Sequence, residues 1–382
     1  MRIAVSLVIP GYNNLRHLKN VYASVKKHAP YAELVLLDDG STDGTWEWIQ
    51  QQDCIGYRSE ERVGHTVLYD KGIELATGEV VGILHADMMI GPNYIENLLK
   101  HLKKGTVVCA TRIEPPLHPE GNEKIIRNFG MDFDDLNVEA FENFCKEVQS
   151  EYRDITTRGM FAPWILYKED FQAIGGHDPL FAPFPYEDSD IFQRWILAGY
   201  ELVQSRDALV YHLTCRGHRW TEEIGKNDNY FQKVEHKARR NYLRKWGSWV
   251  ANDSYQYPII KPRYDVAIRV FNATEALLRE LEPWCNTIYV DLLQEKIDSY
   301  IQQEQPNTAY DLTKRIVDKA GADVTVRIDG KTFDAQDFQH IQMLPDILKE
   351  NQAIGKFKLG NIELTVERLI EYQDQLINLT HG

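Results

Sequence analysis

The sequence predicts an α/β fold in which helices cover both faces of a largely parallel sheet, followed by a second, smaller α/β unit. Apolar runs alternate with helix-like segments in the first half of the chain, and strands covered on both faces are apolar throughout. The length of 382 residues exceeds one typical domain. The last third contains no recognisable catalytic motif. We therefore expect domains at residues 1–250 and 263–382.

The elements of the first half follow one another at short intervals. The expected strands, each a β-branched or leucine-rich run, are Ile3–Ile9, Glu33–Leu37, Val80–Leu84 and Thr106–Ala110. The expected helices between and after them are Leu15–Lys27, Thr45–Gln51, Thr66–Ala76 and Tyr94–Leu102. Ligands of such sheets bind beyond the carboxyl ends of the strands, which is where the polar clusters of this sequence fall.

The rest of the chain is less regular. Residues 112–160 are charged and predict a loop with a helix at Val138–Val148. Asn227–Trp246 is rich in Lys and Arg and predicts a solvated helix. In the second unit the α/β pattern is expected at Val266–Val270, Thr274–Leu281, Thr287–Val290, Thr308–Lys319, Val324–Ile328, Asp337–Lys349 and Val366–Ile377.

Charge and cysteine content narrow the class of protein. The formal net charge of -14 disfavours nucleic acid as a partner, but an anionic small substrate can bind where a metal cation neutralises it. The five cysteines are far apart and form no C-x-x-C pair, which favours a reducing compartment. The start of the chain lacks a signal-peptide cleavage pattern, and no apolar run approaches bilayer length. We expect a cytoplasmic protein, with peripheral membrane contact left open.

The first polar cluster is Asp38-Asp39-Gly40-Ser41-Thr42-Asp43, directly after an apolar run. A carboxylate at a strand end can accept hydrogen bonds from a ribose hydroxyl or a base N–H. The same residue types also favour turns and helix N-caps. We expect a ligand contact for Asp39 and a structural role for Asp43.

The second cluster is His85-Ala86-Asp87, which also ends an apolar run. A carboxylate there can coordinate a hard divalent cation, and such a cation can bridge the phosphates of a nucleotide and stabilise a leaving group. A single strand-end aspartate is common without a metal. Asp87 is therefore a candidate metal ligand that needs support from other residues.

The third cluster, Glu187-Asp188-Ser189-Asp190, begins a helix-like run. Mutual repulsion can raise the pKa of one of these carboxylates and make it a general base. The alternative is that the acidic residues complement the helix dipole. The cluster alone leaves both interpretations open.

The fourth cluster surrounds His212, which ends the strand-like run Ala208–Tyr211. Arg216 and Arg219 follow it and can contact phosphate oxygens, since guanidinium groups match phosphate geometry. A lone histidine is usually structural, and lone arginines are usually surface charge.

In this order and spacing, the clusters resemble the inverting family 2 glycosyltransferases of the GT-A fold, over about residues 1–220. The motifs that carry the resemblance are the Pro10-Gly11-Tyr12-Asn13 turn, Asp38-Asp39, the run Gly78–Asp87, Gly175-Gly176-His177-Asp178, Tyr186-Glu187-Asp188 and His212. It implies a Rossmann-like mixed sheet flanked by helices. It also implies transfer of a hexosyl-type sugar from a nucleotide-diphosphate sugar to a hydroxyl of a glycan, lipid-linked saccharide or protein, as in polysaccharide biosynthesis.

The resemblance implies roles for single residues. Asp39, with Pro10 and Tyr12, would bind the nucleoside of the donor. Asp87 and His212 would hold Mn²⁺ or Mg²⁺ at the diphosphate. In the same comparison, Asp188 would deprotonate the acceptor and Glu187 would orient the acceptor or the base. Arg216 and Arg219 would contact the donor phosphates.

The sequence departs from the family pattern at two places. His85 occupies the first acidic position of the metal motif, and Arg216 stands where processive members have Gln, which indicates a single-addition enzyme. Two other functions stay open: a sugar nucleotidyltransferase and a catalytically inactive carbohydrate-binding relative. The first should have a Gly-rich phosphate loop after the first strand, where this chain has Gly11-Tyr12-Asn13-Asn14. Residues 263–382 are expected to serve as an accessory domain.

Overall fold

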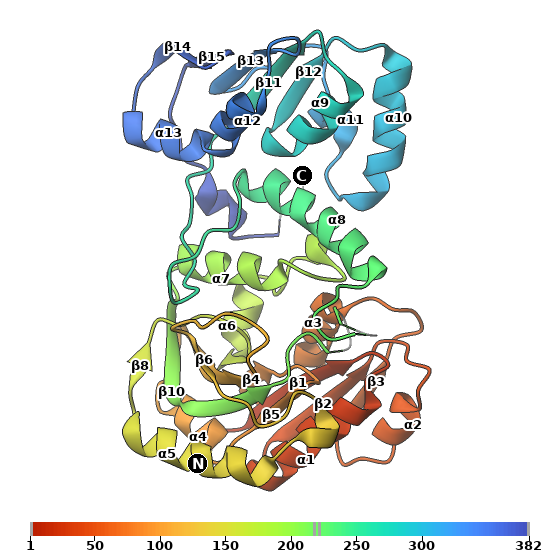
Figure 1. The fold of residues 1–382 in the computed structure, drawn as a ribbon, viewed down its shortest axis with the longest axis vertical. Helices are drawn as coiled ribbons and strands as arrows, with labels where there is room; N and C mark the ends of the chain where they lie inside the picture. The colour runs from red at the N-terminus through yellow and green to blue at the C-terminus, as the bar shows by residue number, and fades with distance from the viewer. Residues whose placement is uncertain (1–2, 217–218, 221–222, 380–382) are drawn as a thin grey trace. The chain divides into compact units, whose positions relative to one another are not determined.

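The computed structural model describes residues 3–216, 219–220 and 223–379, which form two compact units (Figure 1). The N-terminal unit comprises Met1–Glu235 and Asn252–Pro258, and the C-terminal unit comprises His236–Ala251 and Ile259–Gly382. The first contains a large mixed sheet flanked by helices and the second contains a smaller sheet. The predicted fold class is confirmed.

The sheet of the N-terminal unit has the strand order β3-β2-β1-β4-β9-β6-β10-β5, with β7 beside β6 and β8 beside β10. The strands are β1 (Val5–Gly11), β2 (Glu33–Asp38), β3 (Ile55–Arg58), β4 (Val80–Ile83), β5 (Met88–Ile90), β6 (Thr106–Glu114), β7 (Lys124–Ile126), β8 (Thr156–Thr157), β9 (Trp164–Tyr167) and β10 (Glu201–His212). β1, β2, β3 and β4 pair in parallel, as do β6 and β10. β9 runs antiparallel to both β4 and β6, so β6 and β10 have the direction of β1.

Helices cover both faces of this sheet. They are α1 (Leu15–His28), α2 (Thr45–Ile49), α3 (His65–Leu75), α4 (Tyr94–Leu99), α5 (Val138–Glu151), α6 (Lys168–Ala173) and α7 (Glu187–Leu197). Side chains alternate along a strand, so Leu7 packs in one core with residues of α1 and α4, while Val8 faces α3. Gly72 lets α3 approach closely, since a Cβ at this position would lie 2.3 Å from Val8 Cγ1. Burial of both faces explains the apolar strands.

The largest difference between predicted and observed strands concerns β10, which begins at Glu201 rather than near Ala208. Its first half carries polar residues that are buried and satisfied inside the protein. Gln204 Nε2 donates to Glu123 O at 2.6 Å, and Ser205 Oγ donates to Asp207 at 2.7 Å. The partner of Gln204 is distant in the sequence, and the contact of Ser205 lies where the pairing register of β10 shifts. Hydrophobic periodicity therefore does not reveal this half of the strand.

The C-terminal unit is built on a five-stranded sheet with the order β12-β11-β13-β15-β14. Its strands are β11 (Val266–Phe271), β12 (Thr287–Val290), β13 (Val324–Asp329), β14 (Gly355–Leu359) and β15 (Ile362–Val366). Its helices are α9 (Glu275–Leu281), α10 (Gln294–Glu304), α11 (Leu312–Arg315), α12 (Ala335–Gln342) and α13 (Leu344–Asn351). One apolar core joins these strands to the helices.

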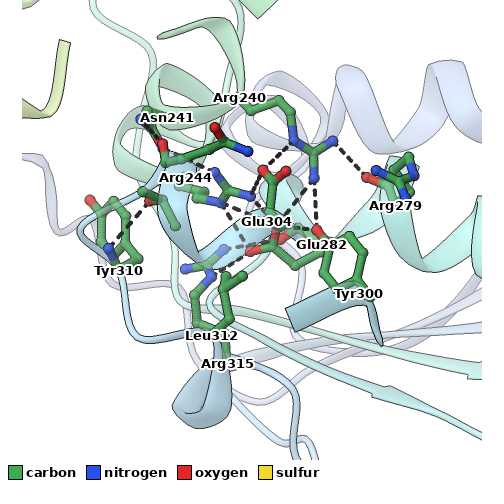
Figure 2. A network of polar contacts seen from close by, with 12 residues as sticks. Arg240, Asn241, Arg244, Arg279, Glu282, Tyr300, Glu304, Tyr310, Leu312 and Arg315 are labelled. Atoms are coloured by element: carbon green, nitrogen blue, oxygen red, sulfur yellow. Dashed lines mark hydrogen bonds and ion pairs between the residues drawn. The ribbon is translucent and has the colours of Figure 1, made fainter. Parts of the chain in front are cut away.

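The prediction of a solvated helix at Asn227–Trp246 is wrong for the second half of α8 (Asn229–Trp246). Arg240, Arg244 and Lys245 are all buried there. Figure 2 shows the arginine network in which Arg240, Arg244 and Arg315 surround the carboxylates of Glu282 and Glu304. Arg244 Nη2 lies 2.6 Å from Glu282, and Arg240 Nε lies 2.7 Å from Glu304. The sequence of α8 cannot reveal these partners.

This network accounts for a boundary that differs from the one expected at residues 250 and 263. Residues 236–251 belong to the C-terminal unit, and 252–258 return to the N-terminal unit. In that return, Tyr255 O accepts a hydrogen bond from Met160 N at 3.1 Å. Among the described helices, none combines the length and apolar character that a bilayer crossing requires.

Candidate functional site

A cavity of about 620 Å³ lies in the N-terminal unit, beside the carboxyl ends of β1, β2, β4 and β10. All the site residues expected from the sequence line it: Pro10, Tyr12, Asp39, Asp87, Glu187, Asp188, His212, Arg216 and Arg219. The carboxyl ends of parallel strands meet at one edge of a sheet, and this places residues 200 positions apart in the chain around one space. The chemical roles of these residues stay predictions.

Asp39 follows β2 and organises the loop that leads into α3. Its carboxylate accepts hydrogen bonds from Val63 N at 2.7 Å and Gly64 N at 3.0 Å. Burial raises the pKa of Asp39, although these backbone N–H groups oppose the shift. Gly64 has a φ of 88°, and a Cβ here would lie 2.2 Å from Pro183. A carboxylate has about four acceptor sites, so Asp39 can still accept from a ligand in the cavity.

Asp43 has the structural role expected of it. Its carboxylate accepts from Leu15 N at 3.0 Å and from Thr45 N at 3.2 Å, at the starts of α1 and α2. It does not line the cavity. Asp39 therefore faces the cavity, whereas Asp43 stabilises the starts of two helices.

The ring of Tyr12 forms one side of a stack around an arginine. The Arg62 guanidinium lies 3.9 Å from the centroid of the Tyr12 ring and 4.3 Å from that of Tyr230. Arg62 Nε is buried without a hydrogen-bond partner among the described residues. Stacked guanidinium groups keep their edge N–H donors available, so Arg62 adds a positive wall to the cavity.

Three side chains form a candidate metal centre: His85, Asp87 and His212. One ligand atom of each lies within 4.8 Å of those of the other two. His212 Nε2 is 3.5 Å from Asp87 Oδ1, and Arg216 N donates to Asp87 Oδ2 at 3.0 Å. His85, which the sequence left unassigned, joins Asp87 and His212 here.

Glu114 at the end of β6 fixes the ring of His212. Its Oε1 lies 3.1 Å from His212 Nδ1, which turns Nε2 toward Asp87. Arg112 and Lys124 contact the same carboxylate at 2.6 and 3.1 Å. Burial opposes ionisation of Glu114, but His212 and Arg112 outweigh it and lower its pKa. A carboxylate behind a metal-facing histidine is a common support of metal sites, because it sets the tautomer and orientation.

Arg216 and Arg219 follow β10 and reach the same cavity. Arg216 is buried and donates to Met131 O through Nη2, whereas its Nε and Nη1 have no partner among the described residues. Arg219 Nε donates to Asn227 Oδ1 at 2.7 Å. Two guanidinium groups beside the aspartates suit an anionic ligand. Gly217 and His218 of the same predicted motif lie outside the described residues.

Glu187 and Asp188 begin α7 and face the cavity together. Glu187 Oε1 lies 2.6 Å from His65 Nε2. Burial opposes ionisation of Glu187, but the charge and hydrogen bond of His65 outweigh it and lower its pKa. Burial and the neighbouring Glu187 charge raise the pKa of Asp188 to about 6. An aspartate with a pKa near neutrality suits general-base work.

Sequence reasoning missed Arg62, His65 and Glu114. Each contacts a residue that is far away in the chain, and none lies in a recognisable cluster. His65 and Glu187 are 122 positions apart, and Glu114 and His212 are 98 apart. The one usable signal for Glu114 is that a charged residue ends an apolar strand, as Asp39 and Asp87 nearly do.

Part of the chain is similar in sequence to a known protein family. Residues 6–168 match the family model described as Glycosyl transferase family 2. The matched segment is similar to this family and makes up less than half of the chain. It contains Pro10, Tyr12, Asp39 and Asp87, while the residues from α7 and β10 onward lie outside it.

The chain also has relatives among curated proteins. The chain is 28% identical over 112 residues to a dolichol-phosphate mannosyltransferase of Pyrococcus furiosus, which covers 28% of this chain and 32% of that protein. It is 24% identical over 258 residues to an uncharacterized protein of Sinorhizobium fredii, which covers 62% of this chain and 27% of that protein. The chain thus spans about a third or less of these curated relatives.

Among solved structures, a mannosyltransferase from Pyrobaculum calidifontis in complex with GDP-Man and Mn2+ matches with a TM-score of 0.43 and 16% identity. The match covers 67% of this chain and 68% of that one.

Proposed function

We propose that this chain is an inverting glycosyltransferase, which moves a sugar from a nucleotide-diphosphate sugar to an acceptor hydroxyl. The observation that carries the proposal is the convergence of Asp39, Asp87 and Asp188 on one cavity. The family 2 match of residues 6–168 supports the same activity. Residues 1–250 hold the transferase in this proposal, with residues 263–382 as an accessory domain.

The donor lies along the strand ends. Asp39 accepts from the base or ribose, with Pro10 and Tyr12 beside it. Arg216 and Arg219 bind the diphosphate, and the buried Nε and Nη1 atoms of Arg216 supply unused donors for it. Charge-assisted hydrogen bonds of this kind are roughly twice as strong as neutral ones.

His85, Asp87 and His212 fit a divalent cation. Two imidazoles and one carboxylate within 4.8 Å of one another form a mixed nitrogen and oxygen donor set, and Glu114 supports His212 from behind. We propose Mn²⁺ or Mg²⁺. A bound cation stabilises negative charge on a leaving diphosphate.

Asp188 takes the proton of the acceptor hydroxyl, and Glu187 orients the acceptor. Attack on the face opposite the leaving diphosphate inverts the anomeric carbon. Positioning of the two substrates supplies much of the rate, because a bound pair reacts as one molecule. The transition state resembles the oxocarbenium ion of glycoside hydrolysis.

The acceptor is a glycan, a lipid-linked saccharide or a protein. The C-terminal unit binds this acceptor or a partner protein in our proposal. The five cysteines are free, which supports a cytoplasmic location. A deletion of residues 263–382 that leaves acceptor affinity and oligomeric state unchanged contradicts the accessory role.

The proposal is tested with a panel of UDP- and GDP-sugars. Ligands that bind the folded state raise its melting temperature, so the donor is identified by thermal shift with and without Mn²⁺. Release of nucleoside diphosphate is then measured with that donor. We expect release with Mn²⁺, loss in EDTA and recovery on adding Mn²⁺. Unchanged release in EDTA contradicts the metal site. A thermal shift without release indicates a carbohydrate-binding relative.

A further inference from the structure

His65 and Glu187 form a close pair, and both residues line the cavity of the N-terminal unit. His65 is the first residue of α3 and Glu187 is the first residue of α7. His65 Nε2 lies 2.6 Å from Glu187 Oε1. The imidazole also stacks on Phe184, with ring centroids 5.1 Å apart and an interplanar angle of 19°. The stack and the bond together fix where the imidazole lies and which nitrogen faces Glu187.

Glu187 is not alone in this place, because Asp188 follows it and lines the same cavity. Two carboxylates confined side by side in a poorly hydrated space do not both ionise readily. His65 contacts Glu187, while no described residue hydrogen-bonds or ion-pairs with the Asp188 carboxylate. The two neighbours therefore differ: one is paired with an imidazole, and the other faces the cavity unpaired.

We propose that His65 is a positioning residue of the transfer reaction: it holds Glu187 as the ionised member of the pair and leaves the exchangeable proton to Asp188. This inference rests on the proposed function. Without the imidazole, Glu187 would compete for the proton that Asp188 must take from the acceptor. With it, the proton that the acceptor hydroxyl loses moves to Asp188, and Glu187 stays charged.

Other titratable or charged groups face this pair from the neighbouring elements. They are Asp39 after β2, Tyr69 on α3, Asp87 after β4, Arg112 on β6 and His177 before α7. His177 has its own carboxylate, since its Nδ1 lies 2.6 Å from Asp70 Oδ1. None of these makes the direct contact that His65 makes with Glu187.

The directions of the pKa shifts agree with this difference between Glu187 and Asp188. Burial opposes protonation of His65, but Glu187, Asp188 and Asp39 outweigh it and raise its pKa. The pKa of Glu187 is lowered and that of Asp188 is raised to about 6. The shifts thus favour an imidazolium paired with a carboxylate, beside Asp188 with its pKa of about 6.

The pairing is tested in the full-length protein without any substrate. Histidine side chains labelled with ¹⁵N are titrated by NMR, and His65 is assigned with His65→Gln. We expect the His65 midpoint to lie above 6.5 and to fall by about one pH unit in Glu187→Gln, because its anionic partner is gone. Asp70→Asn is the matched control, because it removes the carboxylate that contacts His177 instead of His65, and it should leave the His65 midpoint in place. An unchanged His65 midpoint in Glu187→Gln overturns the inference.

The consequence for the reaction is tested by the pH profile of nucleoside diphosphate release, with the donor found by thermal shift. His65→Gln keeps an N–H donor but loses the positive charge. Turnover rises with pH as Asp188 loses its proton, and loss of the cation strengthens proton binding by the pair. We expect the acid limb to move up by about half to one pH unit and kcat to fall about ten-fold, with donor KM retained.

The two proposals fail in different ways. A purely structural role for His65 lowers kcat at every pH without moving the acid limb, and this result overturns the inference while the transferase stands. If the wild-type chain cleaves no donor in the panel, the proposed function fails, and the NMR titration still decides the pairing. Thermal unfolding of His65→Gln and Glu187→Gln shows that both variants are folded.

Discussion

The chain buries two clusters of charged residues, one in each unit, and they are built in opposite ways. In the arginine network, Glu282 receives Arg315 Nε on one oxygen at 2.7 Å and Arg244 Nη2 on the other at 2.6 Å. Tyr300 adds a hydrogen bond at 3.0 Å. In the cavity, no described residue donates a hydrogen bond to Asp188, and two buried nitrogens of Arg216 have no partner within the described ranges.

The ionisation of the carboxylates follows this difference. Burial opposes ionisation of Glu282, but Arg315 and Arg244 outweigh it and lower its pKa strongly. Burial together with the charge of Glu187 raises the pKa of Asp188 to about 6. Burial opposes ionisation of both residues, so burial alone does not decide the outcome. A carboxylate whose acceptor sites are all used inside the protein holds structure, whereas one left unpaired in a cavity serves a ligand.

The largest expected effect is that of Asp188→Asn on turnover. Loss of the general base should lower nucleoside diphosphate release by about 10²–10⁴-fold. Asp190→Asn is the control two positions on, where the carboxylate lies 3.5 Å from Arg194 instead of facing the cavity. This variant should lose stability and keep its turnover per folded molecule. Equal losses of turnover in the two variants would contradict the functional distinction between paired and unpaired carboxylates.

Glu282→Gln should lower the stability of the protein and leave its turnover unchanged. Removing the charge takes from Arg315 and Arg244 the carboxylate that they share, although Arg244 keeps its contact with Glu304. Breaking a buried pair of this kind costs about 3–5 kcal/mol. Urea unfolding measures this loss, and donor cleavage below the transition should stay at the wild-type level. Glu363→Gln is the control, because its pair with Arg327 is 3.0 Å long but exposed, and it should cost no more than about 1 kcal/mol. A loss as small for Glu282 as for Glu363 contradicts the structural role of the network.

Glu114→Gln is expected to weaken metal binding by about 10–100-fold, because the group behind His212 loses its charge. Calorimetric titration with Mn²⁺ measures the dissociation constant. Glu123→Gln serves as the matched control, since Glu123 is also buried and contacts Arg112 at 3.2 Å, without an observed bond to His212. Similar affinities in the two variants would show that the orientation of His212 does not depend on Glu114.

The sequence predicts the cavity better than it predicts the arginine network, and the reason is geometric. Asp39, Asp87 and His212 each stand at or just beyond a strand end, and parallel strands bring their ends to one edge of the sheet. Their convergence therefore follows from local pattern and topology alone. Glu187 and Asp188 follow from a cluster at the start of one helix.

The parts that sequence reasoning missed depend on pairs rather than on patterns. Nothing in the sequence marks His65 as a site residue, because its partner Glu187 contacts it only in the folded chain. Arg240 and Arg244 read as surface charge, because a lysine- and arginine-rich helix is usually solvated and Glu282 lies 38 positions beyond Arg244. No periodicity encodes which distant carboxylate will neutralise a given arginine. Tertiary partners of buried charges are thus the part of this molecule that sequence alone leaves unspecified.

The smallest expected effect is a gain of stability in Asp188→Asn. The pKa of Asp188 is raised from 3.8 to about 6 in the folded chain, so the folded state binds this proton more tightly than the unfolded state does. Its ionisation therefore costs stability above pH 6, and the cost disappears as the pH falls toward 4. The variant should be more stable than the wild type by about 1–3 kcal/mol at pH 8 and nearly equal to it near pH 4. Urea unfolding at both pH values measures the difference, and a loss of stability at pH 8 would mean that the Asp188 carboxylate is satisfied within the protein, as Glu282 is.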